Sequence, residues 1–140
     1  MKITYHWLRE FIDFDWTVKE LSDKLTFSGI EVEAVEPLPD GDFMLDLEIT
    51  PNRPDCLSLL GIARDVRALS GGRLIPPDCG VPEAGPAISG LASLTVEDGQ
   101  GCPRYLARVI TGVRVDESPE WLKQKIEKIE IGRASCRERV

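Results

Sequence analysis

A proline- and glycine-rich stretch at residues 73–91 most limits how this chain can fold. Four prolines and three glycines are spread along it, and no apolar residue recurs there at the spacing of a helix or a strand. A segment of this composition builds no core of its own and is typical of a linker. We therefore expect two folded units, residues 1–72 before the linker and residues 92–130 after it.

The first unit begins with helix signals. Thr17 and Glu20 form the pattern of a capping box, in which each side chain accepts a hydrogen bond from a backbone N–H at the start of a helix. Gly29 stands where a helix needs a left-handed residue to end. We predict a helix over residues 18–28 and an earlier turn or helix around residues 6–11.

The hydrophobic period then changes from that of a helix to that of a strand. Residues 30–35 and 43–49 both alternate apolar and polar side chains, and the turn-forming residues 37–42 lie between them. This pattern predicts an antiparallel hairpin with an acidic outer face. The carboxylates that could meet across it are a candidate acid–base pair, although alternation alone accounts for them as a solvated strand face: Glu31, Glu33, Asp46 and Glu48.

A turn with two prolines follows the hairpin. Residues 50–55 read Thr-Pro-Asn-Arg-Pro-Asp, which indicates an extended and sharply bent connection. Asp55 is the predicted N-cap of a helix over residues 57–70, which the two glycines after it should end. Arg53, and Arg104 in the second unit, could pair with acidic neighbours or contact a partner, and spacing does not decide between these roles.

The second unit is too short to close a core. Residues 93–97 and 104–115 predict two strands, the second interrupted by a glycine, and Ser118 with the proline after it predicts the start of a helix. Two strands and one helix in about 40 residues need further chain to bury their apolar faces.

The last ten residues, 131–140, do not continue this pattern. They have no apolar period, and they resemble the in-frame translation of a sequencing-library adapter. Leaving out their three arginines and one glutamate changes the net charge of the chain from −7 to −9. We expect this tail to bury little surface.

The acidic balance and the missing motifs exclude several classes of function. A net charge of −9 argues against an electrostatic nucleic-acid clamp, and neither a phosphate-binding loop nor a nucleophile elbow is present. His6 is the only histidine, and Cys56, Cys79 and Cys102 lack the paired spacing of zinc ligands. No catalytic, cofactor-binding or metal-binding residue is therefore predicted.

The sequence also argues against membrane and secreted classes. No apolar run approaches the roughly 20 residues that span a bilayer, and the first residues lack the features of a signal peptide. We expect a cytoplasmic protein of the α+β class: a small helix-plus-β-hairpin module, a linker, and the incomplete start of a second α+β domain.

Five blocks of sequence resemble the β subunit of bacterial phenylalanyl-tRNA synthetase. The most specific block is Leu-Glu-Ile-Thr-Pro-Asn-Arg-Pro-Asp-Cys-Leu-Ser at residues 47–58, which is followed by Gly-Ile-Ala-Arg-Asp at residues 61–65. The others are residues 1–11, 25–33 and 102–108. These blocks are spread over residues 1–108 in the order of the family, and the resemblance as a whole extends over nearly all of residues 1–129.

The resemblance implies part of an α2β2 ligase that joins phenylalanine to its tRNA with ATP and magnesium. In that family the α subunit carries the aminoacylation site, and the β subunit contributes tRNA contacts and an editing site. Residues 1–72 would be the N-terminal module of the β subunit, and residues 92–130 the truncated start of its editing-region domain. The fragment itself would be structural and inactive alone.

One departure from the family concerns the hairpin turn at residues 37–42. The family usually inserts an OB-fold tRNA-binding domain there, and six residues take its place in this chain. A hairpin tip can gain or lose a domain with little damage to the strands. We therefore expect little or no tRNA contact by this fragment. The alternatives are a free-standing protein- or nucleic-acid-binding module and a small hydrolase that uses the hairpin carboxylates.

Overall fold

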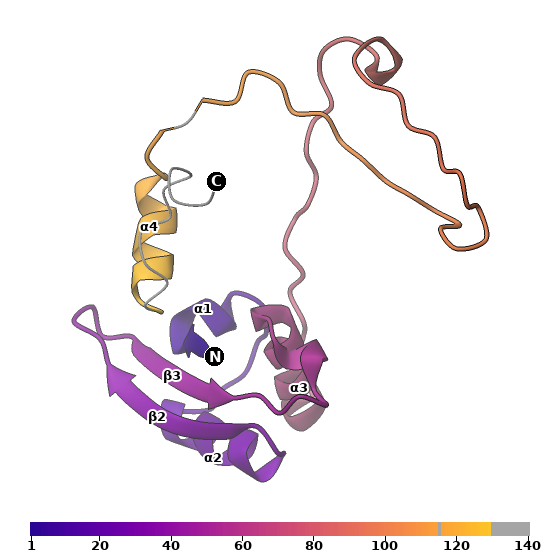
Figure 1. Cartoon of the computed structure of the whole chain (residues 1–140). Coiled ribbons are helices and arrows are strands. Elements are labelled where there is room, and N and C mark those ends of the chain that lie inside the picture. The colour runs from indigo at the N-terminus through magenta and orange to yellow at the C-terminus, as the bar shows by residue number, and fades with distance from the viewer. Residues whose placement is uncertain (115, 130–140) are drawn as a thin grey trace. The chain divides into compact units, whose positions relative to one another are not determined.

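The computed structural model describes residues 1–114 and 116–129, which fall into two units (Figure 1). Among the described residues, 1–78 and 117–129 form the first unit, and 79–114 with Asp116 form the second. The tail at residues 131–140, for which the sequence predicts little burial, lies outside the described residues. No described helix is long and apolar enough to span a membrane.

An antiparallel sheet of three strands organises the first unit. Strand β2 (Glu31–Pro37) and strand β3 (Phe43–Glu48) form the predicted hairpin, which is therefore confirmed. Strand β1 (Lys2–Thr4), which the sequence did not predict, pairs with the other edge of β3, so that the strand order is β1-β3-β2. At three residues, β1 is too short to show an alternating pattern in the sequence.

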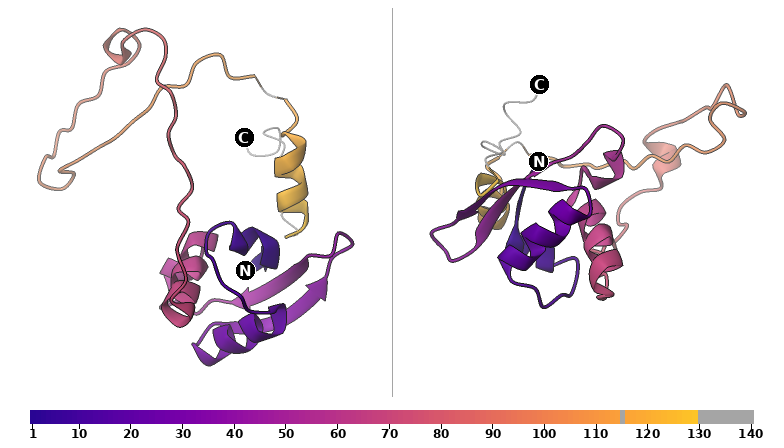
Figure 2. Two further views of the ribbon diagram at one scale, coloured as in Figure 1. Left: turned by 180° about the vertical axis from the view of Figure 1, so that it is seen from behind. Right: turned by 90° about the horizontal axis from the view of Figure 1, so that it is seen from below.

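Helix α1 (Tyr5–Arg9) and helix α2 (Val18–Phe27) follow β1 in the chain. The capping box that predicts α2 is present, because the side chain of Thr17 accepts from the backbone of Glu20 while the Glu20 carboxylate accepts from the backbone of Thr17. Helix α2 lies along the β2–β3 hairpin (Figure 2).

The core of the unit lies between these helices, the sheet and helix α3 (Leu59–Ser70). Its members are the buried apolar side chains of β1, β3, the three helices and the segments between elements: Ile3, Leu8, Ile12, Phe14, Leu21, Leu25, Ile30, Leu45, Leu47, Cys56, Ile62, Ala63 and Val66.

The start of α3 differs from the prediction. A single 3₁₀ turn at Pro54–Cys56 precedes the helix, and the N-cap is Ser58, whose hydroxyl accepts from the backbone N–H of Gly61 at 3.1 Å. Asp55 was therefore wrongly predicted as the cap, because Arg53 binds its carboxylate instead. The predicted end of the helix is confirmed, since Gly71 takes the left-handed conformation with φ of 70°.

The chain after α3 stays attached to the first unit. Leu74 forms a β-bridge with Ile12, and the backbone N–H of Ile75 donates to the carbonyl of Phe11 at 2.7 Å. Gly72 lies so close to Asp13 that a Cβ there would come within 1.9 Å of the Asp13 carbonyl oxygen. The linker therefore leaves the module only after these contacts.

The strands predicted at residues 93–97 and 104–115 are wrong for the part of the second unit that is described. Its one regular element is a 3₁₀ turn at Ile88–Gly90, and the rest is irregular. A strand is stable only when another strand pairs with it, and alternation in the sequence does not supply that partner. Helix α4 (Glu120–Glu127) follows, with Pro119 rather than Ser118 at its N-cap position.

Candidate functional site

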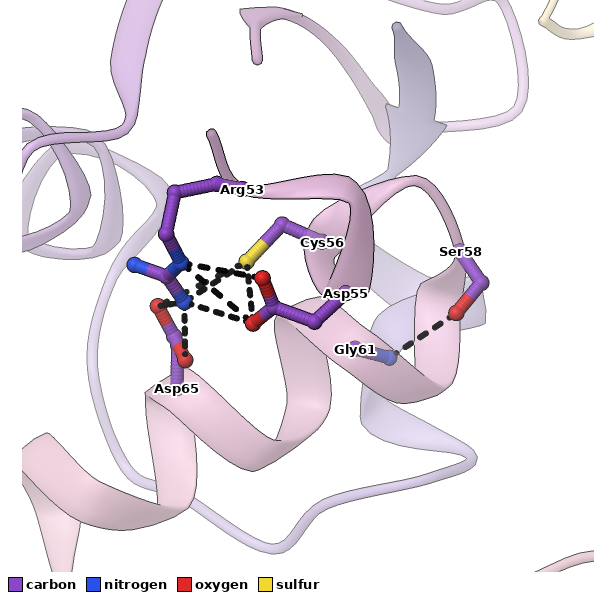
Figure 3. A network of polar contacts seen from close by, with 6 residues as sticks. All are labelled: Arg53, Asp55, Cys56, Ser58, Gly61 and Asp65. Atoms are coloured by element: carbon purple, nitrogen blue, oxygen red, sulfur yellow. Dashed lines mark hydrogen bonds and ion pairs between the residues drawn. The ribbon is translucent and has the colours of Figure 1, made fainter. Parts of the chain in front are cut away.

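The most connected group of polar side chains is centred on Arg53, in the turn between β3 and α3 (Figure 3). The Nη2 atom of Arg53 donates to both carboxylate oxygens of Asp65, at 2.9 and 2.8 Å, and to one oxygen of Asp55 at 2.9 Å. The same nitrogen lies 2.9 Å from Sγ of Cys56. We call these four residues the Arg53 cluster.

Local backbone geometry brings the Arg53 cluster together. Pro54 opens the 3₁₀ turn, which places Asp55 and Cys56 next to each other and over the first turn of α3. The turn can approach α3 because Gly61 has no side chain: a Cβ there would lie 1.9 Å from the carbonyl oxygen of Asp55. Asp65, half-buried one turn further along α3, then faces Arg53.

The charges within the Arg53 cluster satisfy one another. Hydrogen bonding to Arg53 lowers the pKa of the Asp55 carboxyl to about 2, and the two carboxylates in turn raise the pKa of Arg53. Burial and the neighbouring Asp55 carboxylate raise the pKa of the Cys56 thiol to about 11. Cys56 therefore stays protonated at neutral pH, where a nucleophilic cysteine would need a thiolate.

The Arg53 cluster has the residue types of a metal site but the bonding of a salt bridge. Ligand atoms of Asp55, Cys56 and Asp65 lie within 4.8 Å of one another, the one such group among the residues that the structure describes. The guanidinium of Arg53 already hydrogen-bonds to all three, and a protonated thiol is a poor metal ligand. The arrangement ties the turn to α3.

From the sequence, Arg53 is predicted either to pair with acidic neighbours or to contact a partner, and the structure shows the pairing. The sequence does not predict Asp65 or Cys56 as members of the cluster. A signal for Asp65 exists, because this acid borders the helix face that carries the buried Ile62 and Val66. Arg104, the second candidate, is exposed in the second unit.

The hairpin carboxylates do not gather into an acid–base pair. Glu31 and Glu48 stand opposite each other in the strand register and are exposed, as is Glu33. Asp46 instead pairs with the amino group of Met1 at 3.4 Å and lies 4.0 Å from the Lys2 ammonium. The arrangement is that of a solvated strand face with one ion-paired end.

His6 is an exposed side chain at the start of α1. Its Nδ1 lies 3.5 Å from the buried carboxylate of Asp42, which also accepts the backbone N–H of His6 at 2.9 Å. The backbone N–H of Phe43 donates to the same Asp42 oxygen at 2.8 Å. Asp42 thus connects the hairpin tip to α1, and the His6 side chain lies next to this connection.

Known proteins similar to this chain include β subunits of phenylalanine–tRNA ligase from several bacteria. The β subunit of phenylalanine–tRNA ligase from Rhodopirellula baltica is 41% identical over 132 residues, which are 94% of this chain and 19% of that protein. The β subunits from Syntrophotalea carbinolica and Thermotoga maritima are 47% and 44% identical over 91 and 95 residues. The chain is homologous to the β subunit of bacterial phenylalanine–tRNA ligase.

This homology extends over most of the chain but a small part of each relative. The chain spans between about a tenth and a fifth of the length of these β subunits. The match to the Rhodopirellula baltica β subunit is long enough to include the whole Arg53 cluster and the hairpin tip. No family model matches the chain.

Proposed function

We propose that this chain is part of a phenylalanine–tRNA ligase β subunit and that its first unit is a structural module, without an aminoacylation or editing site. The observation that carries the proposal is the Arg53 cluster. It lies in the two adjacent sequence blocks, residues 47–58 and 61–65, that carry the most specific resemblance to the family, and there its charged groups are bound to one another and its thiol is protonated. A cluster of this kind holds a turn in place and activates no nucleophile.

The partners and cofactors of the proposed whole enzyme follow from the family. An α subunit would assemble with the β subunit into an α2β2 enzyme in the cytoplasm, and this enzyme would use ATP and magnesium to charge tRNA with phenylalanine. The contribution of this chain would be to the folding and placement of the β subunit.

Little or no tRNA contact is proposed for the part of the β subunit seen here. The hairpin tip is closed on itself, since the backbone N–H of Leu38 donates to the carbonyl of Asp42 at 2.8 Å. The exposed glutamates of the hairpin, Glu31, Glu33 and Glu48, face solvent and would repel a phosphate backbone. The long alignment with the Rhodopirellula baltica β subunit supports a short tip as native to such proteins.

The test is co-expression of the complete gene that encodes these residues with a phenylalanine–tRNA ligase α subunit from the same genome. We expect a stable complex on size-exclusion chromatography and phenylalanine-dependent, ATP-dependent charging of tRNA. A complex that charges no tRNA, or two subunits that do not associate, would refute the assignment.

A pair of variants in that complex tests the structural role. Arg53→Gln should lower the yield of assembled enzyme and its thermal midpoint, while the kcat of the assembled fraction stays unchanged. Arg64→Gln, on the exposed side of α3, is the matched control and should change neither quantity. A large loss of kcat in assembled Arg53→Gln enzyme would instead place Arg53 in the catalytic machinery.

A further inference from the structure

Helix α4 belongs to the first unit although 38 residues of the second unit separate it from the rest of that module. Its side chains at positions 122 and 126 are half-buried, and Ile129, just after the helix, is buried. Trp121, on another face of the helix, is 62% exposed. One face of α4 is therefore covered and another is open to solvent.

Two lysines on this segment reach acidic groups of the module. Lys125 donates to both carboxylate oxygens of Glu10, at 2.7 and 2.5 Å, and its ammonium lies 5.4 Å from the ring centre of Trp7. Lys128 pairs with Asp40 and lies 3.9 Å from Asp42. We call the four partner residues, Trp7, Glu10, Asp40 and Asp42, the α1–tip surface.

We propose that the α1–tip surface is a docking site for a lysine-bearing amphipathic helix, and that α4 of the same chain occupies it. Charge complementarity supports this occupant, because three carboxylates meet two ammonium groups spaced three residues apart. Asp42 is almost fully buried and accepts hydrogen bonds from the backbone N–H groups of His6 and Phe43, so this carboxylate is held in place by the module itself.

Because α4 is covalently connected to the rest of the first unit, a weak contact is sufficient for it to dock. Exposed ion pairs contribute little each, and two of them would not hold a separate peptide at ordinary concentrations. A flexible connection keeps the second site at an effective concentration on the order of millimolar, so that a weak site is occupied within one molecule. Docking within the chain should therefore depend on salt and not on protein concentration.

Hydrogen–deuterium exchange of residues 117–129 in the full chain tests the proposal. We expect protection of the α4 amides that falls with increasing salt and does not change with protein concentration. Lys125→Glu should lower the ratio of docked to undocked molecules about fivefold or more, because it replaces an attraction by a repulsion. Glu10→Lys combined with Lys125→Glu should restore the protection.

The matched control is Lys123→Glu, which makes the same change in net charge. Lys123 pairs with Glu117 of its own segment at 2.5 Å and not with the α1–tip surface. This variant should leave the protection of α4 within twofold of the wild type. Equal losses in both variants, or failure of the charge swap to restore protection, would overturn the proposal. Protection that rises with protein concentration would also overturn it, in favour of a second copy as the occupant.

Discussion

Arg53 and Asp65, twelve residues apart, are joined by two hydrogen bonds from Nη2 of the guanidinium to the two oxygens of the carboxylate. Arg53 lies in the turn after β3 and Asp65 in the middle of α3, so this pair links the turn that leaves the sheet to helix α3. Both side chains are partly exposed, at 32% and 23%. The pair therefore fixes the position of the turn on α3 but contributes only modestly to the free energy of unfolding.

Substitutions at this pair should be coupled. Asp65→Asn should lower the thermal midpoint of the first unit by roughly 4 to 8 °C, because an ion pair of this exposure contributes modestly to a small domain. Arg53→Gln should lower it further, since Asp55 and Asp65 then face each other without a cation. The double variant should fall by less than the sum of the two changes, as measured by circular dichroism on heating. Additive changes would show that the pair has no direct interaction.

The bond between Arg53 and Asp55 predicts an acid-dependent loss of stability. The pKa of Asp55 is lowered from an ordinary 3.8 to about 2, so the folded state favours the charged carboxylate. The contribution is fully present above pH 3.8 and is lost as the pH falls through 2. Urea unfolding between pH 7 and pH 2 should show a smaller decline over the last two pH units for Asp55→Asn than for the wild type. Identical declines would contradict the assigned cause.

The elements that the sequence predicted well are those whose determinants are local. The helix after Thr17 and its end near Gly29 follow from capping groups within a few residues, and the hairpin follows from alternation on both sides of a turn. Each determinant is satisfied inside the element that contains it.

The errors arise where a side chain had distant or competing partners. Asp55 has the chemistry of an N-cap, but Arg53 two residues earlier binds its carboxylate, and Ser58 takes the cap. The role of Asp65 required a partner twelve residues away, and β1 required the neighbouring strand β3. Chain-local patterns do not contain this information.

The cysteines should differ in reactivity because of the environment of Cys56. This thiol is fully buried, and its pKa is raised to about 11, whereas Cys102 is partly exposed. At pH 8 iodoacetamide should label Cys102 rapidly and Cys56 at least tenfold more slowly, as read by mass spectrometry of the separate peptides. In urea the two rates should become similar. Rapid labelling of Cys56 in the folded chain would show that the Arg53 cluster opens.

The capping box of α2 should make a measurable contribution to stability. Thr17→Ala removes the oxygen that accepts the backbone N–H of Glu20, which should cost about 1 kcal/mol of unfolding free energy in urea titration. Thr17→Ser keeps that oxygen and serves as the control, with a loss well below that of alanine. Equal losses for both variants would indicate that the methyl group of Thr17, and not its hydroxyl, matters.

Gly61 should tolerate no side chain, because the turn that carries Asp55 and Cys56 rests directly on it. A Cβ at this position would lie 1.9 Å from the Asp55 carbonyl oxygen and 3.0 Å from Cα of Cys56, and both are backbone atoms that cannot rotate away. Gly61→Ala should therefore destabilise the first unit by about 1 to 3 kcal/mol in urea titration and speed the labelling of Cys56. Gly90→Ala is the matched control, since no atom lies within 4 Å of the added carbon. Unchanged stability and labelling in Gly61→Ala would mean that the turn does not rest on α3 in solution.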